Sequence, residues 1–77
     1  MDNYYDKQLA KMTEWIKLFQ RMSSNQKIKI FTEDSGTDVW YENTISEISF
    51  EDLTEFAEYE LDDISAKDEV IVICCGK

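Results

Sequence analysis

Residues 27–45 read KIKIFTEDSGTDVWYENTI, and they set the architecture expected for this chain. The first four residues alternate polar and apolar side chains, which is typical of a half-buried β-strand. Residues 34–37 have turn chemistry, and Gly36 can adopt the positive φ that a bulged turn requires. The Val-Trp-Tyr segment at 39–41 consists of strong strand formers. The stretch therefore predicts a β-hairpin.

Amphipathic helices are predicted on both sides of this hairpin. Over residues 4–22, apolar side chains recur at spacings of four and three, which form one stripe on a helix. The stripe comprises Tyr5, Leu9, Met12, Ile16 and Phe19, and it is widened by Trp15 and Met22. Residues 49–61 predict a second helix, with Ser49 as the N-cap and Asp52 near the position of a capping-box acid. Its expected buried stripe is Phe50, Leu53, Ala57 and Leu61, with Ile64 as a further candidate.

The last element is a β-branched run over residues 69–75, which lacks alternation and suits a strand well inside a sheet. The order of elements is thus α-β-β-α-β. We expect a single α+β domain, residues 1–77, in two layers: a three-stranded, mostly antiparallel sheet packed against two helices. A right-handed crossover through the second helix would place the last strand beside the first and parallel to the second, in the order 2-1-3.

The charge of the chain is distributed unevenly. Residues 30–66 contain 12 acids and no base, whereas residues 1–29 contain three acids and six bases, and the net charge is −9. This charge argues strongly against direct binding of nucleic acid, which depends on Lys and Arg neutralising phosphates. It also argues against docking on anionic membranes. A basic protein surface is the favoured partner.

The residues that usually carry catalysis are scarce. Histidine is absent, and there is no phosphate-binding loop or nucleophile elbow. The acid pairs at 62–63 and 68–69 lack the spacing of a calcium loop. We therefore expect no enzyme activity, no cofactor and no metal site. Cys74 and Cys75 are the only candidate nucleophiles. Two adjacent thiols without a disulfide framework, and no visible signal peptide or membrane-spanning run, favour a cytoplasmic protein.

Two surfaces are candidates for binding a partner. On the predicted second helix, acids at spacings of four, three and four would form a ridge with no base between them, an uncompensated repulsion that suggests a function. On the hairpin, either Trp40 or Tyr41 should face outward as an aromatic anchor ringed by acids. The predicted partner-binding residues are Glu33, Asp34, Asp38, Trp40, Glu42, Glu51, Glu55, Glu58 and Asp62.

In size, acidity and lack of catalytic residues, the chain resembles phage and mobile-element inhibitors of bacterial defence, especially anti-CRISPR proteins and antirestriction DNA mimics. The resemblance covers the whole chain as a compositional style and matches no motif. It implies a non-enzymatic inhibitor, monomeric or weakly dimeric, that binds a basic groove of a nuclease by imitating the charge of DNA. One alternative is an adaptor domain that binds through an aromatic sheet face, its acidity serving solubility only. Another is an enzyme that uses Cys74 or Cys75.

Overall fold

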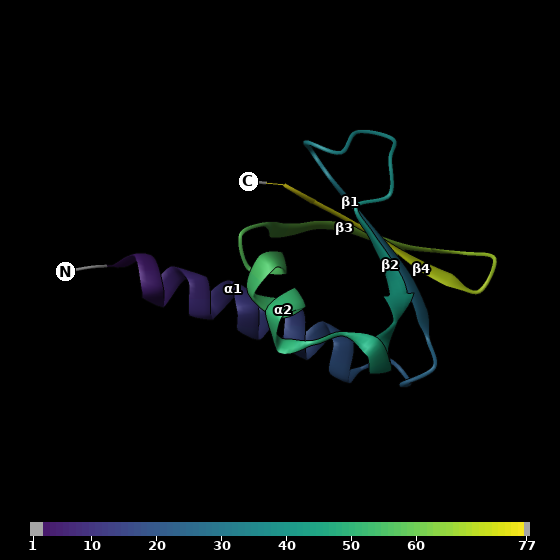
Figure 1. Ribbon diagram of the computed structural model, residues 1–77, viewed down its shortest axis with the longest axis horizontal. Coiled ribbons are helices and arrows are strands. Elements are labelled where there is room, and N and C mark those ends of the chain that lie inside the picture. Colours follow the sequence, from purple (N-terminus) through teal and green to yellow (C-terminus); the bar gives the residue numbers. More distant parts are fainter. Residues whose placement is uncertain (1–2, 77) are drawn as a thin grey trace.

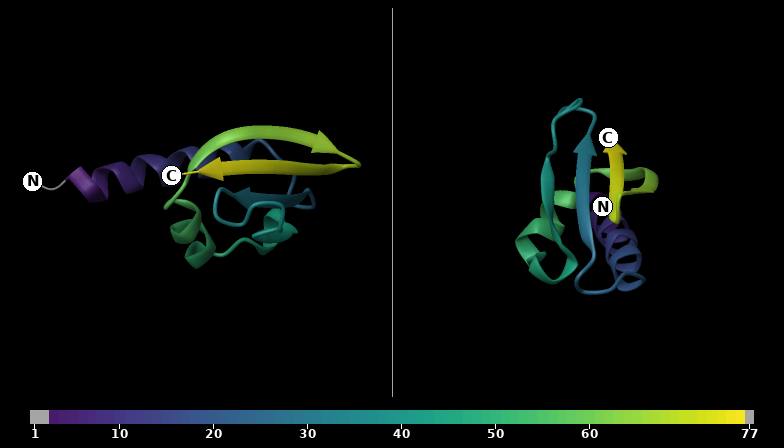
Figure 2. Two further views of the ribbon diagram at one scale, coloured as in Figure 1. Left: turned by 90° about the horizontal axis from the view of Figure 1, so that it is seen from above. Right: turned by 90° about the vertical axis from the view of Figure 1, so that its right-hand side faces the viewer.

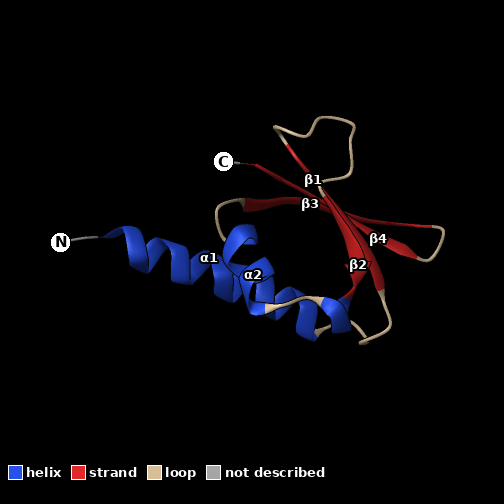
Figure 3. Ribbon diagram, in the orientation of Figure 1, coloured by secondary structure: helices blue, strands red, loops and turns tan. Residues whose placement is uncertain are grey.

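Two helices and a four-stranded sheet form the part of the chain that the computed structural model describes, which is residues 3–76, with side chains from residue 6 onward (Figure 1). The elements are α1 (Asn3–Gln20), β1 (Lys27–Thr32), β2 (Tyr41–Thr44), a 3₁₀ turn (Ile45–Glu47), α2 (Phe50–Phe56), β3 (Glu60–Lys67) and β4 (Val70–Gly76). The N-terminal turns of α1 extend beyond the sheet (Figures 1 and 3).

The sheet has the order β2-β1-β4-β3 and is mixed. β1 pairs antiparallel with β2 and parallel with β4, and β4 pairs antiparallel with β3 (Figure 2). The α+β class and the position of the last strand beside the first are confirmed, as is the interior position of β4. The prediction of three strands is wrong, because β3 adds a fourth. The prediction that the last strand runs parallel to the second is also wrong, because the β3–β4 hairpin reverses the chain once more after α2.

The predicted second helix is shorter than expected. The Ser49 cap and the capping box with Asp52 are confirmed, but α2 ends at Phe56 and residues 60–67 form β3. Seven of the eight β3 residues are exposed, so this strand lacks the apolar alternation that marks most strands. The two-residue turn that follows has positive φ at Asp68 (52°) and Glu69 (67°), which defines a type I′ turn without the usual Asn or Gly.

The core lies between the sheet and both helices. Its largest fully buried side chains are Trp15, Phe56, Ile28, Ile30 and Ile73. Trp15 and Phe56 pack with ring centroids 5.2 Å apart, and the Trp15 indole N–H donates to the Tyr59 carbonyl at 3.1 Å. α1 therefore turns its Trp15 side to the core.

The residues that each helix buries differ from the predicted apolar stripes. Leu9 is 60% exposed, although it was expected inside, because the buried face of α1 centres on Trp15. Tyr5 lies outside the described side chains. Phe50 is 71% exposed at the first position of α2, so its place in the predicted stripe is also wrong, whereas Ala57 is buried.

Candidate functional site

Acids from two separate segments meet the end of β4 at one end of the sheet. Glu33 and Asp34 follow β1, and Glu60 and Asp62 lie in the first residues of β3. Glu33, Glu60 and Asp62 line a small cavity of about 160 Å³ together with Leu61 and Gly76. Asp34 accepts a hydrogen bond from the Tyr59 hydroxyl at 3.5 Å. We call Glu33, Asp34, Glu60 and Asp62 the acidic end.

The strand directions explain why these residues meet. β1 and β4 are parallel and so finish at the same end of the sheet, while β3, antiparallel to β4, begins there. A tight turn then holds the chain as it leaves β1. The backbone N–H of Thr32 donates to Ser35 Oγ, and the Ser35 N–H donates to Thr32 Oγ1, both at 2.9 Å. Glu33 and Asp34 lie within this turn, and both are exposed.

The acidic end affects the thiol beneath it. Cys75 is only 3% exposed and its thiol contacts the Phe31 carbonyl at 3.6 Å. Burial, with smaller contributions from Cys74 and from the charges of Asp62 and Glu33, raises the pKa of Cys75 to about 11. These surroundings disfavour a thiolate, which is the form that acts as a nucleophile.

The remaining predicted acids lie elsewhere. Glu42 on β2 is 4.0 Å from the Lys29 ammonium, measured between Nζ and Oε2, and Asp38 is exposed in the loop between β1 and β2. Glu51 and Glu55 are exposed on α2. Glu58 follows α2 and accepts a hydrogen bond from Gln8 at 3.5 Å. The predicted ridge of Glu51, Glu55, Glu58 and Asp62 on one helix face is therefore wrong, because α2 ends before its last two members.

The predicted aromatic anchor is also wrong. Trp40 packs against Phe56 (5.6 Å between centroids) and Tyr59 (5.1 Å), and Tyr41 packs against Phe56 (5.0 Å). Both aromatic side chains face α2 because Trp40 precedes β2, where strand alternation does not yet apply. The backbone N–H of Trp40 donates to the Ile30 carbonyl at 2.8 Å, and this bond holds the segment before β2 against β1. Neither residue is the outward-facing aromatic side chain that the adaptor alternative requires.

Asp52 differs from the other acids because its carboxylate accepts two short hydrogen bonds that join α2 to β2. Its Oδ2 accepts the Ser49 N–H and the Tyr41 hydroxyl, both at 3.0 Å. The Ser49 bond chiefly lowers the pKa of Asp52, and burial followed by the Asp52 carboxylate raises the pKa of Tyr41 to about 12. Asp52 thus caps α2 and ties it to β2.

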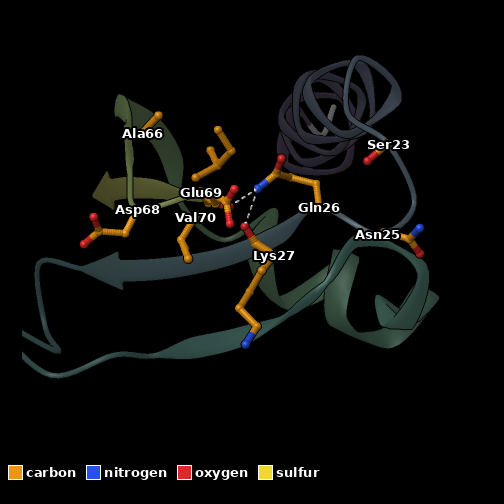
Figure 4. Close-up of a pocket in the computed structure, with 9 residues that line it drawn as sticks. Ser23, Asn25, Gln26, Lys27, Ala66, Asp68, Glu69 and Val70 are labelled. Carbon is orange, nitrogen blue, oxygen red and sulfur yellow. Dashed lines mark hydrogen bonds between the residues drawn. The ribbon is translucent and has the colours of Figure 1, made fainter.

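A cavity of about 690 Å³ opens between the segment after α1 and the β3–β4 turn (Figure 4). Gln26 spans it, since its side-chain amide donates to the carbonyls of Lys27 and Glu69, both at 2.9 Å. Figure 4 shows these two bonds beside Asp68 and Val70. Across residues 3–76, no group of three or more His, Cys, Asp or Glu side chains is arranged to hold a metal ion. No helix in the same range is both long and apolar enough to cross a membrane.

Sequence reasoning missed Glu60 as a member of the acidic end, because it placed this residue on a helix. Recognising residues 60–67 as a strand that begins at this end of the sheet would have placed Glu60 there. Comparison of the chain with protein-family models, with curated proteins and with solved structures gives no match.

Proposed function

We propose that the chain is a non-enzymatic inhibitor that occupies a basic nucleic-acid-binding groove of a defence nuclease, such as a CRISPR effector. The observation that carries this proposal is the acidic end, where four exposed carboxylates from two segments lie around the end of β4. Duplex DNA presents one negative charge per about 1.7 Å of helix axis, so a groove lined with Lys and Arg accepts closely spaced anions. Electrostatic attraction between the acidic chain and the basic groove would also speed their association.

The absence of described ion pairs in the acidic end supports the same proposal. Within residues 6–76, Lys29 and Glu42 form the one ion pair, and neither belongs to the acidic end. Lys7 and Lys11 of α1 line a neighbouring groove with Glu60 and so bound the negative surface on that side. Clustered like charge costs stability, which makes its retention an indication of function.

The test is competition between the chain and duplex DNA for purified nucleases, namely a panel of CRISPR effectors and restriction enzymes, measured as inhibition of DNA cleavage. Inhibition should be relieved by excess DNA and should weaken as salt rises. Glu33→Gln with Asp62→Asn should weaken inhibition at least about tenfold, a loss of about 1.4 kcal/mol of binding free energy. The matched control is Asp68→Asn with Glu69→Gln, which removes the same charge from the opposite end of β3 and β4.

Equal losses in the two double variants would mean that only net charge matters, and the assignment to the acidic end would be wrong. Inhibition that excess DNA does not relieve would contradict occupation of the nucleic-acid groove.

A further inference from the structure

β3 is an open edge of the sheet. It lies outermost in the order β2-β1-β4-β3 and pairs with β4 alone (Figure 2). Residues 62–67 are all exposed, so no described segment covers this part of the strand. The opposite edge, β2, has only four residues and leads directly into a 3₁₀ turn and α2. β3 is therefore the longer of the two edges, and its outer backbone groups are available for pairing.

The register identifies which backbone groups point outward. Lys67 and Val70 flank a two-residue turn, so they form a hydrogen-bonded pair. The pairing alternates along an antiparallel ladder, so Ser65 also directs its N–H and C=O toward β4. Ile64 and Ala66 then direct theirs to the open edge. An irregularity between Leu61 and Asp63 separates this regular stretch, residues 63–67, from the pairs of Glu60 with Gly76 and Leu61 with Cys75.

The side chains of β3 divide between two faces. Ile64 pairs with Ile73 and Ala66 with Ile71, so both lie on the face that carries the core. Ile64 is nevertheless 43% exposed. Ala66 and Ile71 line the cavity of about 690 Å³, which leaves room on this face for apolar side chains (Figure 4). Asp63 and Ser65 point to the other face.

The charge of β3 determines which kind of extended segment can pair with this edge. Glu60, Asp62 and Asp63 occupy the first half of β3, and Lys67 is the one base of the strand. A second copy of the chain, with a net charge of −9, would bring further acids to this edge, and like charges on paired strands repel. A basic segment meets attraction at the same positions.

We propose that the outer edge of β3 binds an extended, basic segment of a partner protein, which adds to the sheet as a fifth strand. Main-chain hydrogen bonds to Ile64 and Ala66 hold the segment. Its apolar side chains cover Ile64 on one face, and its Lys or Arg side chains approach Asp63 on the other. The segment that fits therefore alternates basic and apolar residues. This site does not depend on the target being a nuclease.

The experiment uses the full chain and a capped synthetic octapeptide of alternating Lys and Val. Nuclear magnetic resonance titration should show binding, with slower hydrogen exchange at the amides of Ile64 and Ala66. The same peptide with an N-methyl group on every residue keeps its charge but cannot donate a main-chain hydrogen bond from either edge, so its Kd should be at least about tenfold weaker. A Glu-Val octapeptide should not bind.

Ala66→Pro removes an outward N–H while sparing the ladder to β4, a substitution that edge strands tolerate. It should weaken binding of the Lys-Val peptide at least about tenfold with an unchanged circular dichroism spectrum. If the variant does not fold, the N-methylated peptide still decides the question.

Equal binding of the N-methylated and unmethylated peptides would overturn the proposal, because attraction between charges would then be sufficient. Sedimentation showing a dimer of the chain, with the amides of Ile64 and Ala66 protected without peptide, would also overturn it by making a second copy the occupant. Failure in the nuclease assay leaves these results unaffected, so the two proposals are tested separately.

Discussion

Replacing Asp52 with alanine should destabilise the fold, whereas neutralising acids of the acidic end should leave it unchanged or stabilise it. The Asp52 carboxylate accepts hydrogen bonds from the Ser49 N–H and the Tyr41 hydroxyl, both at 3.0 Å. Loss of the capping-box bond from the Ser49 N–H to this carboxylate costs about 1 kcal/mol, while the Ser49 cap itself remains. Loss of the hydrogen bond from the Tyr41 hydroxyl costs at most roughly 1 kcal/mol more, because water can replace the carboxylate as the partner of this half-buried hydroxyl. We expect a total of about 1–2 kcal/mol, or a decrease in Tm of roughly 5–15 °C for a domain of this size.

Neutralising Glu33 and Asp62 should have the opposite effect on the free energy of unfolding. Neither carboxylate has a described ion pair, and each lies near other acids around the same small cavity. Removing like charge on this scale relieves repulsion by a few tenths of a kcal/mol. Glu33→Gln with Asp62→Asn should therefore raise the free energy of unfolding slightly.

Urea denaturation measures both effects through tryptophan fluorescence, since Trp15 and Trp40 lie in the aromatic cluster around Phe56. Glu55→Ala is the control for Asp52→Ala, because Glu55 is exposed on the same helix, and it should change stability by less than about 0.5 kcal/mol. If Asp52→Ala matches this control, the capping network does not stabilise the fold. If the Glu33 and Asp62 variant is destabilised as much as Asp52→Ala, the acidic end is part of the stabilising framework, and the argument for function from uncompensated charge is refuted.

Three further outcomes follow from the same contacts. The pKa of Tyr41 is raised to about 12, so this residue's contribution to stability is present below pH 10 and is lost as pH rises from about 10 to 12. Because solvent screens this hydroxyl, thermal melts should show an alkaline loss of about 1 kcal/mol that Tyr41→Phe lacks, and identical profiles would refute the linkage. Asp68→Asn with Glu69→Gly should stabilise by about 1–2 kcal/mol in urea melts, because both positions have positive φ, whereas a loss of stability would contradict the type I′ turn. At pH 8, iodoacetamide should modify the half-buried thiol of Cys74 at least about tenfold faster than that of Cys75, measured by mass spectrometry on the two single serine variants; the reverse order would contradict the burial of Cys75.

The sequence predicted the elements whose local signals agree with their environment. The hairpin of β1 and β2 follows from the alternation at residues 27–30 and the turn chemistry at residues 34–37, and α2 begins where its capping box indicates. The uniform apolar run of β4 correctly indicated an interior strand.

β3 could not be recognised in the same way, because an edge strand that is exposed on both faces has no apolar periodicity. The acids of residues 60–63 continue the composition of α2, and the Asp68–Glu69 turn lacks glycine, so neither the end of the helix nor the hairpin gave a signal. The prediction of a carboxylate ridge on a helix depended on that error. The acidic end itself depends on the parallel pairing of β1 with β4, which is a tertiary contact and leaves no mark on local sequence.

Solubility alone does not account for where the acids are. A solubilising charge can lie anywhere on the surface, and α1 shows the ordinary arrangement, with Glu14 among Lys7, Lys11 and Lys17. Beyond β1 the bases are absent up to Lys67, and five of the 12 acids of residues 30–66 lie at the two surfaces proposed above to bind a partner: Glu33, Asp34, Glu60, Asp62 and Asp63. At the end of β1 and β4 they form a negative surface without a described ion pair, and along β3 they would discourage pairing with a second copy and attract the proposed basic segment. The two surfaces share Glu60 and Asp62, so a single basic partner can engage both at once. The shared residues supply a prediction: Asp62→Lys should weaken nuclease inhibition and binding of the Lys-Val peptide together, whereas Glu33→Lys should affect inhibition alone.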